Sequence, residues 1–533
     1  MNKTSDRVFL RTELDKILPK IINKTFEEVD KKNLFETQKN KLTTSSMDKG
    51  IFGKVIEYSV LDMNLDQKSE PDIDIDYKGT SEVYRGIEHT EIKTTGLIKK
   101  KKSNKLELVP KERVSITAVS IGNIEKEEFD HSAFWHKIEH LLWIFYEYKY
   151  KCREKKLNER TGKYSYKNIP YSPYEQRYFV ILNVGYQHMK KCPDDYVKLQ
   201  HDWQVIHDYL VEIQDKPQED KEKNWWPMLY TNTKANLWYV DIAPRYPNNP
   251  RLAFKSSYVT TIYDTMFRNG KYEVLDTTYS SYDELNTMLH DKAELYAGKR
   301  LSQIANELGL EYASAKNKNL TEAIALALFD DKIKKLNKID IFCKAGIICK
   351  TITLNKNFKN TENGTKLFTI DLEEFSNPNI PYEESNYYEY FSSHRFLFIV
   401  FQEKNDKQSN DLHKFLGFKW LSFDDLLYTD CIRVWEDARD KIINDKVEET
   451  YCRRKKDNSI IYNKTKTAST TLNFPKSSEG NIFFRGTGNN STNKAWIFNG
   501  KAADGSNIIH AYSQQVWIKG QYIAKKLMDI DYI

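Results

Sequence analysis

The sequence predicts an α/β protein in which one arrangement of elements occurs twice. A helix is expected from Met47 to Leu61, followed by a strand-like run that contains Glu91. From about Thr278 a weaker version of the same pattern begins again. At 533 residues the chain exceeds what one hydrophobic core usually serves. We therefore expect two domains, residues 1–277 and 278–533.

The composition is that of an ordinary soluble protein, with 40% hydrophobic and 30% charged residues. The net charge of +6 is too small to imply nucleic-acid binding by itself. The six cysteines form no C-x-x-C pair, which predicts neither a zinc cluster nor a disulfide framework. The first residues contain no apolar stretch typical of a signal peptide, and the run at 396–401 is too short to span a membrane. These features predict a cytoplasmic protein.

Carboxylates and one lysine suggest the chemistry of the first half. Glu91 and Lys93 are two residues apart in the strand-like run, so their side chains project to one face. Glu57 lies on the expected helix, beside the apolar residues Val55, Ile56 and Val60. A cluster of three aspartates follows Pro71, namely Asp72, Asp74 and Asp76. Acids and an ammonium group that converge at a strand end suit hydrolysis with a bound Mg²⁺ ion.

An E-x-K triplet alone is common on exposed strands, but its combination with the preceding motifs is rare. The segment KG-IFG-KVIE at 49–57, Pro71-Asp72 and the EIKTT at 91–95 together resemble the PD-(D/E)xK nucleases. The particular form is similar to the MutH family and its larger relatives, the Sau-type GATC-cutting type II restriction endonucleases. This resemblance implies a restriction-endonuclease-like mixed sheet flanked by helices, present as a tandem duplication of two MutH-like domains.

The resemblance also implies a role for each residue of the first site. Asp72 and Glu91 would bind Mg²⁺, with the Ile92 carbonyl as a further ligand. Lys93 would orient or help deprotonate the attacking water, and Glu57 would position the water, the lysine or a second ion.

The spacing departs from the family's compact D-x₆-E-x-K. About a dozen additional residues separate Asp72 from Glu91. The metal-binding aspartate therefore stays open among the three aspartates of the cluster, and Pro71 favours Asp72. Glu82 and Glu88 fit less well because neither follows the motif.

Residues 229–261 resemble the T-K-G-A and R-A-F-x-L-K-S-x-Y segments that line the DNA groove in the MutH-like family. By position, this resemblance and the KG at the start of the expected helix give six candidates for DNA contact: Lys49, Lys234, Arg251, Lys255, Ser257 and Tyr258. Arg or Lys bidentate to guanine is the usual basis of major-groove recognition. An ordinary surface hairpin is the alternative interpretation.

Two further features have competing interpretations. The lysine run at 99–102 is expected on a loop, either as a solvated tip or as a contact to DNA phosphates. His131, His136 and His140 include a pair four residues apart that would suit a metal on a helix. No third ligand follows at a suitable spacing, which favours core or surface histidines.

The second half repeats the pattern without its acids. Helices are expected at 301–310 and 320–329, and a strand at 345–354. In this alignment Lys350 takes the place of Lys93, while Ile348 and Leu326 replace the two glutamates.

Weaker parallels join later segments. Residues 396–401 parallel 178–184, the segment 430–442 parallels the helix expected at 196–213, and the C-terminal stretch resembles basic DNA-facing segments. Without carboxylates the second site cannot bind Mg²⁺, so the second half is predicted to bind DNA or to regulate the first.

The resemblance implies a type II restriction endonuclease that cuts both strands of double-stranded DNA at GATC and leaves 5′-phosphate ends. It implies a cognate DNA methyltransferase as functional partner, and the duplication suggests that two DNA copies, or two chains in a dimer, meet during cleavage. A MutH-type nicking mismatch-repair enzyme and a non-catalytic DNA-binding protein are the alternatives.

Overall fold

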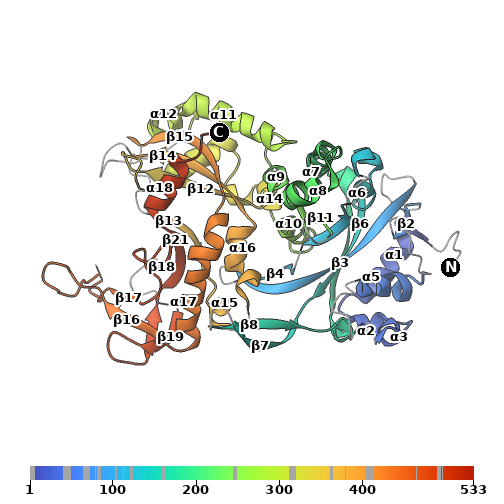
Figure 1. Ribbon diagram of the computed structural model, residues 1–533, viewed down its shortest axis with the longest axis horizontal. Helices are drawn as coiled ribbons and strands as arrows, with labels where there is room; N and C mark the ends of the chain where they lie inside the picture. The colour runs from blue at the N-terminus through green and yellow to red at the C-terminus, as the bar shows by residue number, and fades with distance from the viewer. Residues whose placement is uncertain are drawn as a thin grey trace.

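The computed structural model of the chain describes residues 7–39, 42, 50–63, 72–78, 80, 86–102, 105–111, 113–119, 124–158, 163–243, 249–310, 320–360, 364–377, 380–403, 412–463, 465–488, 494 and 496–533. It is an α/β protein with mixed sheets, as predicted (Figure 1). In the part of the chain so described, no helix is long and apolar enough to cross a membrane.

The central sheet of the first half is mixed. Its strands run in the order β1 (Val8–Leu10), β2 (Ile73–Asp76), β3 (Ile87–Lys102), β6 (His140–Glu147) and β9 (Ile181–His188), and β4 (Lys105–Pro110) pairs with β3. β3 and β6 are parallel, whereas β2–β3 and β6–β9 are antiparallel. The apolar run of β6 is buried almost throughout, as expected for a strand covered on both faces.

Two layers of helices cover this sheet. On one face lie the N-terminal helices α1 (Arg11–Ile17), α2 (Phe26–Val29), α3 (Leu34–Thr37) and α5 (Ile51–Lys54), and on the other α7 (Pro193–Glu212) and α10 (Ser256–Phe267). Alternate residues of β6 separate the two cores: Leu142 and Ile144 pack toward the N-terminal helices, and Leu141, Trp143 and Phe145 pack toward α7 and α10. The predicted buried stripe of α7 is confirmed at Leu199, Trp203, Ile206 and Leu210.

The predicted helix at 47–61 is present from Ile51 and changes its winding halfway. α5 continues into a π-helical turn over Val55–Val60, which carries Glu57. Val55 and Ile56 are fully buried, as predicted, whereas Val60 is only partly buried. π-turns of this kind are rare and are frequent at functional sites.

The elements of the second half follow a similar order. β12 (Ile347–Leu354) and β14 (Arg395–Gln402) are parallel, and β14 is antiparallel to β15 (Lys414–Leu421), as in β3, β6 and β9. Consequently residues 396–401 correspond by topology to β6 and not to 178–184, so that part of the sequence alignment was wrong. The apolar character of both segments had made them look alike.

A second, three-stranded sheet occurs in each half. In the first half β5 (Val114–Ala118), β11 (Arg251–Phe254) and β10 (Val240–Ile242) pair in that order, and α10 follows β11. In the second, β13 (Thr365–Thr369), β21 (Ser513–Ile518) and β18 (Ile482–Thr487) do the same, and α18 (Gly520–Met528) follows β21.

The remaining elements connect or extend these sheets. A four-stranded sheet has the order β17 (Thr470–Leu472), β16 (Val447–Tyr451), β19 (Trp496–Lys501) and β20 (Ile508–Ala511), and β7 (Tyr150–Asn158) pairs with β8 (Lys163–Pro170). The other helices are α6 (Ala133–His136), α8 (Gln218–Asp220), α9 (Leu229–Thr233), α11 (Tyr282–Tyr296), α12 (Leu301–Glu307), α13 (Leu320–Phe329), α14 (Asp340–Ala345), α15 (Leu372–Ser376), α16 (Asn386–Ser392) and α17 (Ile432–Ile443).

One hydrophobic core extends across position 278. It joins Tyr258 and Ile262 of α10 to Leu285 of α11 and Phe342 of α14. A separate core lies within 352–527. The two halves therefore share buried surface instead of meeting through a linker.

Two local predictions are wrong. The lysine run at 99–102 is not a loop, because β3 continues through it and pairs with β4. His136 and His140 do not share a helix, since α6 ends at His136 and His140 begins β6. In both places strand pairing with a distant or following segment overrides the local pattern.

Candidate active site

The start of β3 carries the predicted acid and lysine on one face. Lys93 Nζ donates to Glu91 Oε1 at 2.9 Å, and Glu91 is only 7% exposed. Strand alternation places Ile92 on the opposite face, where it packs in the core under the N-terminal helices. The strand therefore holds Glu91 and Lys93 together at the edge of that core.

The structure places Asp72, and not its two neighbours, beside Glu91. The β2–β3 register pairs Ile73 with Thr90, so the preceding residue, Asp72, comes opposite Glu91. Asp72 Oδ2 accepts a hydrogen bond from the Ile92 amide at 2.7 Å. The other two aspartates have different partners: Asp74 pairs with the His89 ring, and Asp76 accepts from the Lys78 amide at 2.9 Å.

Glu57 reaches this group from the π-turn. Burial raises the pKa of Glu57 to about 7, and repulsion from Asp72 and Glu91 adds to the shift. Burial likewise raises the pKa of Asp72 to about 6, again with repulsion from Glu91. The three carboxylates thus form a largely buried acidic group whose charges destabilise one another. A cation bound among them would relieve this repulsion.

A second lysine completes the group. Lys137, directly after α6, donates from Nζ to Glu91 Oε2 at 2.6 Å. Its position is fixed by α6, which Ser132 caps through the Trp135 amide and whose Phe134 and Trp135 are buried. Lys137 could not be predicted from the sequence because it lies 46 residues from Glu91 in an aromatic stretch with no motif.

Neutralising Glu57 should stabilise the metal-free protein. Because the folded-state pKa of Glu57 is raised, its charge opposes folding above about pH 7, and this penalty disappears as the pH falls below the unfolded value near 4.5. We expect Glu57→Gln to increase the free energy of unfolding at pH 8 in EDTA by about 1–3 kcal/mol. Chemical denaturation at pH 8 and pH 5 measures this difference, which should shrink at pH 5. The exposed Glu128→Gln is the control, and a destabilised Glu57→Gln at pH 8 would contradict the electrostatic account.

The corresponding positions of the second half hold no acid. Lys350 lies opposite Phe398 of β14, as Lys93 lies opposite Trp143 of β6. Burial lowers the pKa of Lys350 to about 8, and its Nζ donates to the Leu367 carbonyl at 2.7 Å.

The predicted DNA-contacting residues divide into two groups. Arg251 is exposed, and Lys234 is partly exposed and pairs with Asp424 of the second half at 2.8 Å. Lys49 lies outside the described residues. The other three, Lys255, Ser257 and Tyr258, are directed into the protein.

α14 of the second half packs against α10 beside these three residues. Lys255 Nζ donates to the Leu237 and Ala345 carbonyls, and Ser257 Oγ donates to the Lys344 carbonyl at 2.9 Å. Tyr258 is fully buried and its hydroxyl lies 2.8 Å from Gln187 Nε2. In this arrangement all three side chains form hydrogen bonds within the protein, and their contact with DNA stays a prediction. No local sequence pattern indicates that the second half packs against them.

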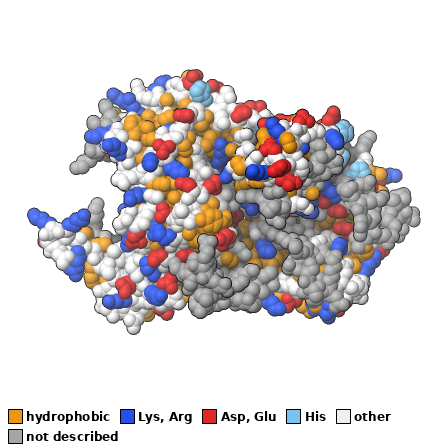
Figure 2. All heavy atoms as spheres, in the orientation of Figure 1, with side chains coloured by type: hydrophobic (Ala, Val, Ile, Leu, Met, Phe, Trp, Pro, Cys, Tyr) orange, Lys and Arg blue, Asp and Glu red, His pale blue; other side chains and the backbone are white. Residues whose placement is uncertain are grey.

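Basic side chains gather at one place in the second half. On the face shown in Figure 2, Lys and Arg are mostly interspersed with Asp and Glu. They come together at the projecting tip on the left, over the β16–β17 connection, where residues 453–456 (RRKK) are exposed.

Part of the chain is similar in sequence to MutH-like nucleases. Residues 64–178 match the family model of the DNA mismatch repair enzyme MutH, a segment that contains Asp72, Glu91, Lys93 and Lys137. Over 349 residues the chain is 23% identical to the type II restriction enzyme Sau3AI of Staphylococcus aureus. This match covers 62% of the chain and 65% of the enzyme, just under two thirds of its length. The resemblance to MutH-like restriction endonucleases is confirmed.

Proposed function

We propose that this protein is a Mg²⁺-dependent type II restriction endonuclease. The observation that carries the proposal is the convergence of Glu57, Asp72, Glu91 and Lys93 at the start of β3. The similarity to MutH and to Sau3AI supports the same class of reaction.

The acidic group fits a hard divalent cation. Asp72 and Glu91 offer the carboxylate oxygens that Mg²⁺ prefers. Burial and repulsion from Glu91 raise the pKa of Asp72, and a cation bound near neutral pH would compensate the charge that this environment disfavours. When bound there, Mg²⁺ would supply charge stabilisation for the phosphate in the transition state. Glu57 would position the attacking water or a second ion.

The two lysines would have different roles, one on the attacking water and one on the Glu91 carboxylate. Lys93 Nζ would hold the water, or help to deprotonate it, for attack in line with the P–O3′ bond. Breaking that bond leaves the phosphate on the 5′ end. Lys137 keeps the Glu91 carboxylate in place through its 2.6 Å hydrogen bond, which makes it a positioning residue.

The chain would consist of two copies of one fold, residues 1–277 and 278–533. The repeated strand order of both sheets, and the helix that follows β11 and β21, support a tandem duplication. The second copy, with Ile348 in place of Glu91, would bind DNA or regulate cleavage. The basic tip at 453–456 would contribute phosphate contacts.

DNA would contact the first copy through Lys49, Lys234 and Arg251. The bases recognised would be GATC, cut on both strands. Lys255, Ser257 and Tyr258 would join only if α14 moved away from α10. A cognate DNA methyltransferase would protect the host sites, and two DNA copies or a dimer would meet during cleavage.

Cleavage of unmethylated plasmid DNA, with Mg²⁺ or with EDTA, followed by sequencing of the ends, tests the proposal. We expect discrete fragments that end at GATC with Mg²⁺ and intact plasmid with EDTA. Discrete cuts elsewhere would refute the specificity alone. Nicked circles would favour a mismatch-repair enzyme, and a gel shift without cutting would favour a DNA-binding protein.

A further inference from the structure

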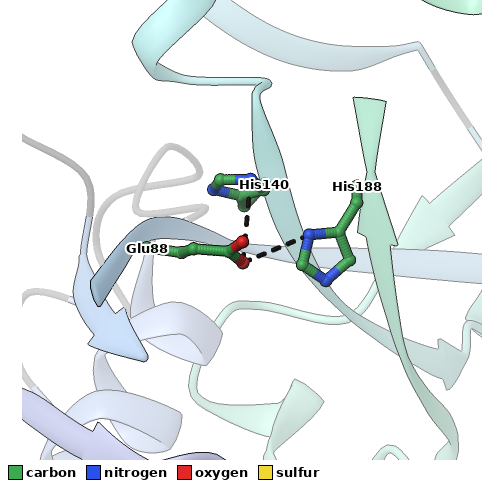
Figure 3. Close-up of side chains that lie close together, drawn as sticks. All are labelled: Glu88, His140 and His188. Carbon is green, nitrogen blue, oxygen red and sulfur yellow. Dashed lines mark ion pairs between the residues drawn. The ribbon is translucent and has the colours of Figure 1, made fainter. Parts of the chain in front are cut away.

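A second group of potential metal ligands lies on the other face of β3. Glu88 of β3, His140 of β6 and His188 of β9 come together across three adjacent strands, and the Glu88 carboxylate lies between the two rings (Figure 3). Their exposed fractions are 9%, 7% and 8%. Because strand side chains alternate, Glu88 projects away from the face that carries Glu91 and Lys93. The group is therefore separate from the candidate active site.

The spacing of the ligand atoms suits a tetrahedral ion. Glu88 Oε2 lies 3.2 Å from His188 Nδ1 and 3.7 Å from His140 Nε2, and one ligand atom from each residue lies within 4.8 Å of the others. Two atoms that each lie about 2.0–2.1 Å from a tetrahedral ion are about 3.3 Å apart. Small side-chain adjustments would thus bring all three atoms to coordination distance.

In both histidines, the ring nitrogen that does not face Glu88 has a polar partner, as is common in metal-binding histidines. His140 Nδ1 lies 3.2 Å from the His89 carbonyl, which can only accept, so Nδ1 carries the proton and Nε2 faces Glu88. His188 Nε2 lies 2.9 Å from the Tyr77 hydroxyl, and its Nδ1 faces the same carboxylate. Histidines that bind metals commonly direct the second ring nitrogen to a carbonyl or another polar group in this way.

A plain ion pair of protonated histidine with glutamate is the competing explanation. A protonated ring would donate a hydrogen bond to the carboxylate, but the 3.7 Å between His140 Nε2 and Glu88 Oε2 is longer than a hydrogen bond. A neutral ring with its proton on Nδ1 presents a lone pair from Nε2 to the Glu88 carboxylate. A cation between the two groups would stabilise this arrangement.

We propose that Glu88, His140 and His188 bind one divalent transition-metal ion of the Zn²⁺ class. Two imidazole nitrogens and one carboxylate favour such an ion over Mg²⁺, which prefers oxygen ligands. The ion would join β3, β6 and β9 at the end of the sheet where β3 and β6 begin, and it would stabilise the strand that carries Glu91 on its opposite face. The site does not depend on the proposed nuclease activity.

Zinc binding by the full-length protein tests this site directly. After chelator treatment and dialysis, Zn²⁺ would be titrated against a chromophoric competitor, and Co²⁺ would be added to a parallel sample to record the visible absorption of a tetrahedral site. Wild type, Glu91→Gln and His131→Gln, an exposed histidine, should each bind one equivalent tightly. Glu88→Gln and His188→Leu should bind at least about 100-fold more weakly and lose the Co²⁺ absorption.

Each other outcome would overturn the site. Zinc that is lost in Glu91→Gln but kept in Glu88→Gln would belong to the catalytic carboxylates, and equal binding by all variants would place it elsewhere. Failure of wild type to retain zinc would also refute it. Glu88→Gln keeps the size of the side chain, and addition of Zn²⁺ should raise the Tm of wild type but not of this variant. Because no cleavage is measured, the outcome is independent of whether the protein cuts DNA.

Discussion

Glu91→Gln is expected to reduce DNA cleavage by about a thousand-fold or more, which corresponds to about 4 kcal/mol of transition-state stabilisation. Glu91 lies opposite Asp72 and accepts hydrogen bonds from Lys93 and Lys137, so it supports both the proposed ion and the lysine that orients the water. The amide has the same shape but cannot supply the charge. Single-turnover cleavage of a GATC-containing duplex with Mg²⁺ measures the loss.

DNA binding should survive this substitution. Removal of one negative charge does not weaken contacts to phosphates, and metal stabilisation acts mainly in the transition state. A gel shift in Ca²⁺ or EDTA should therefore give an affinity within a few-fold of wild type. Glu147→Gln is the matched control, because Glu147 is also a partly buried glutamate, on the adjacent strand β6, and pairs with Lys99 and Lys149 instead. Normal cleavage by Glu91→Gln would refute the assignment of the site.

The local part of the site could be predicted from the sequence because it depends on strand geometry. The two-residue spacing of Glu91 and Lys93 fixes their common face in any strand. The helix with Glu57 can be predicted from its apolar period, whereas its π-turn cannot. Asp72 could be favoured but not settled, because about a dozen additional residues obscure the family spacing. The β2–β3 register supports Asp72, since it brings this residue opposite Glu91 whatever the length of the connection.

The parts that could not be predicted all depend on contacts between distant segments. Lys137 joins the site only because the end of α6 brings it within hydrogen-bond distance of Glu91, and His188 meets His140 only through the β6–β9 pairing. Lys255 has a suitable type and position for DNA contact, yet α14 covers it from 90 residues away. Spacing within one segment carries no information about such approaches.

The second large effect expected is on Lys93, for which the chain provides its own control. Lys93→Met should reduce the cleavage rate by about 10²–10⁴-fold, because the water loses the group that orients or deprotonates it. Lys350→Met makes the same change at the corresponding position of the second half. It should leave cleavage within about threefold of wild type, since Ile348 and Leu326 stand where the acids would be.

The comparison separates chemistry from packing because the methionine side chain is similar in size to that of lysine at both sites. Lys350 is partly buried and burial lowers its pKa to about 8, so its replacement by an apolar side chain should not lower the Tm greatly. Equal loss of cleavage in both variants would mean that the second half also takes part in the reaction, against its proposed binding or regulatory role. If both variants cleaved DNA at the wild-type rate, Lys93 would have no role in the mechanism. Loss in Lys93→Met alone, with DNA binding preserved in both, would assign the reaction to the first half and leave the second with DNA contact or control.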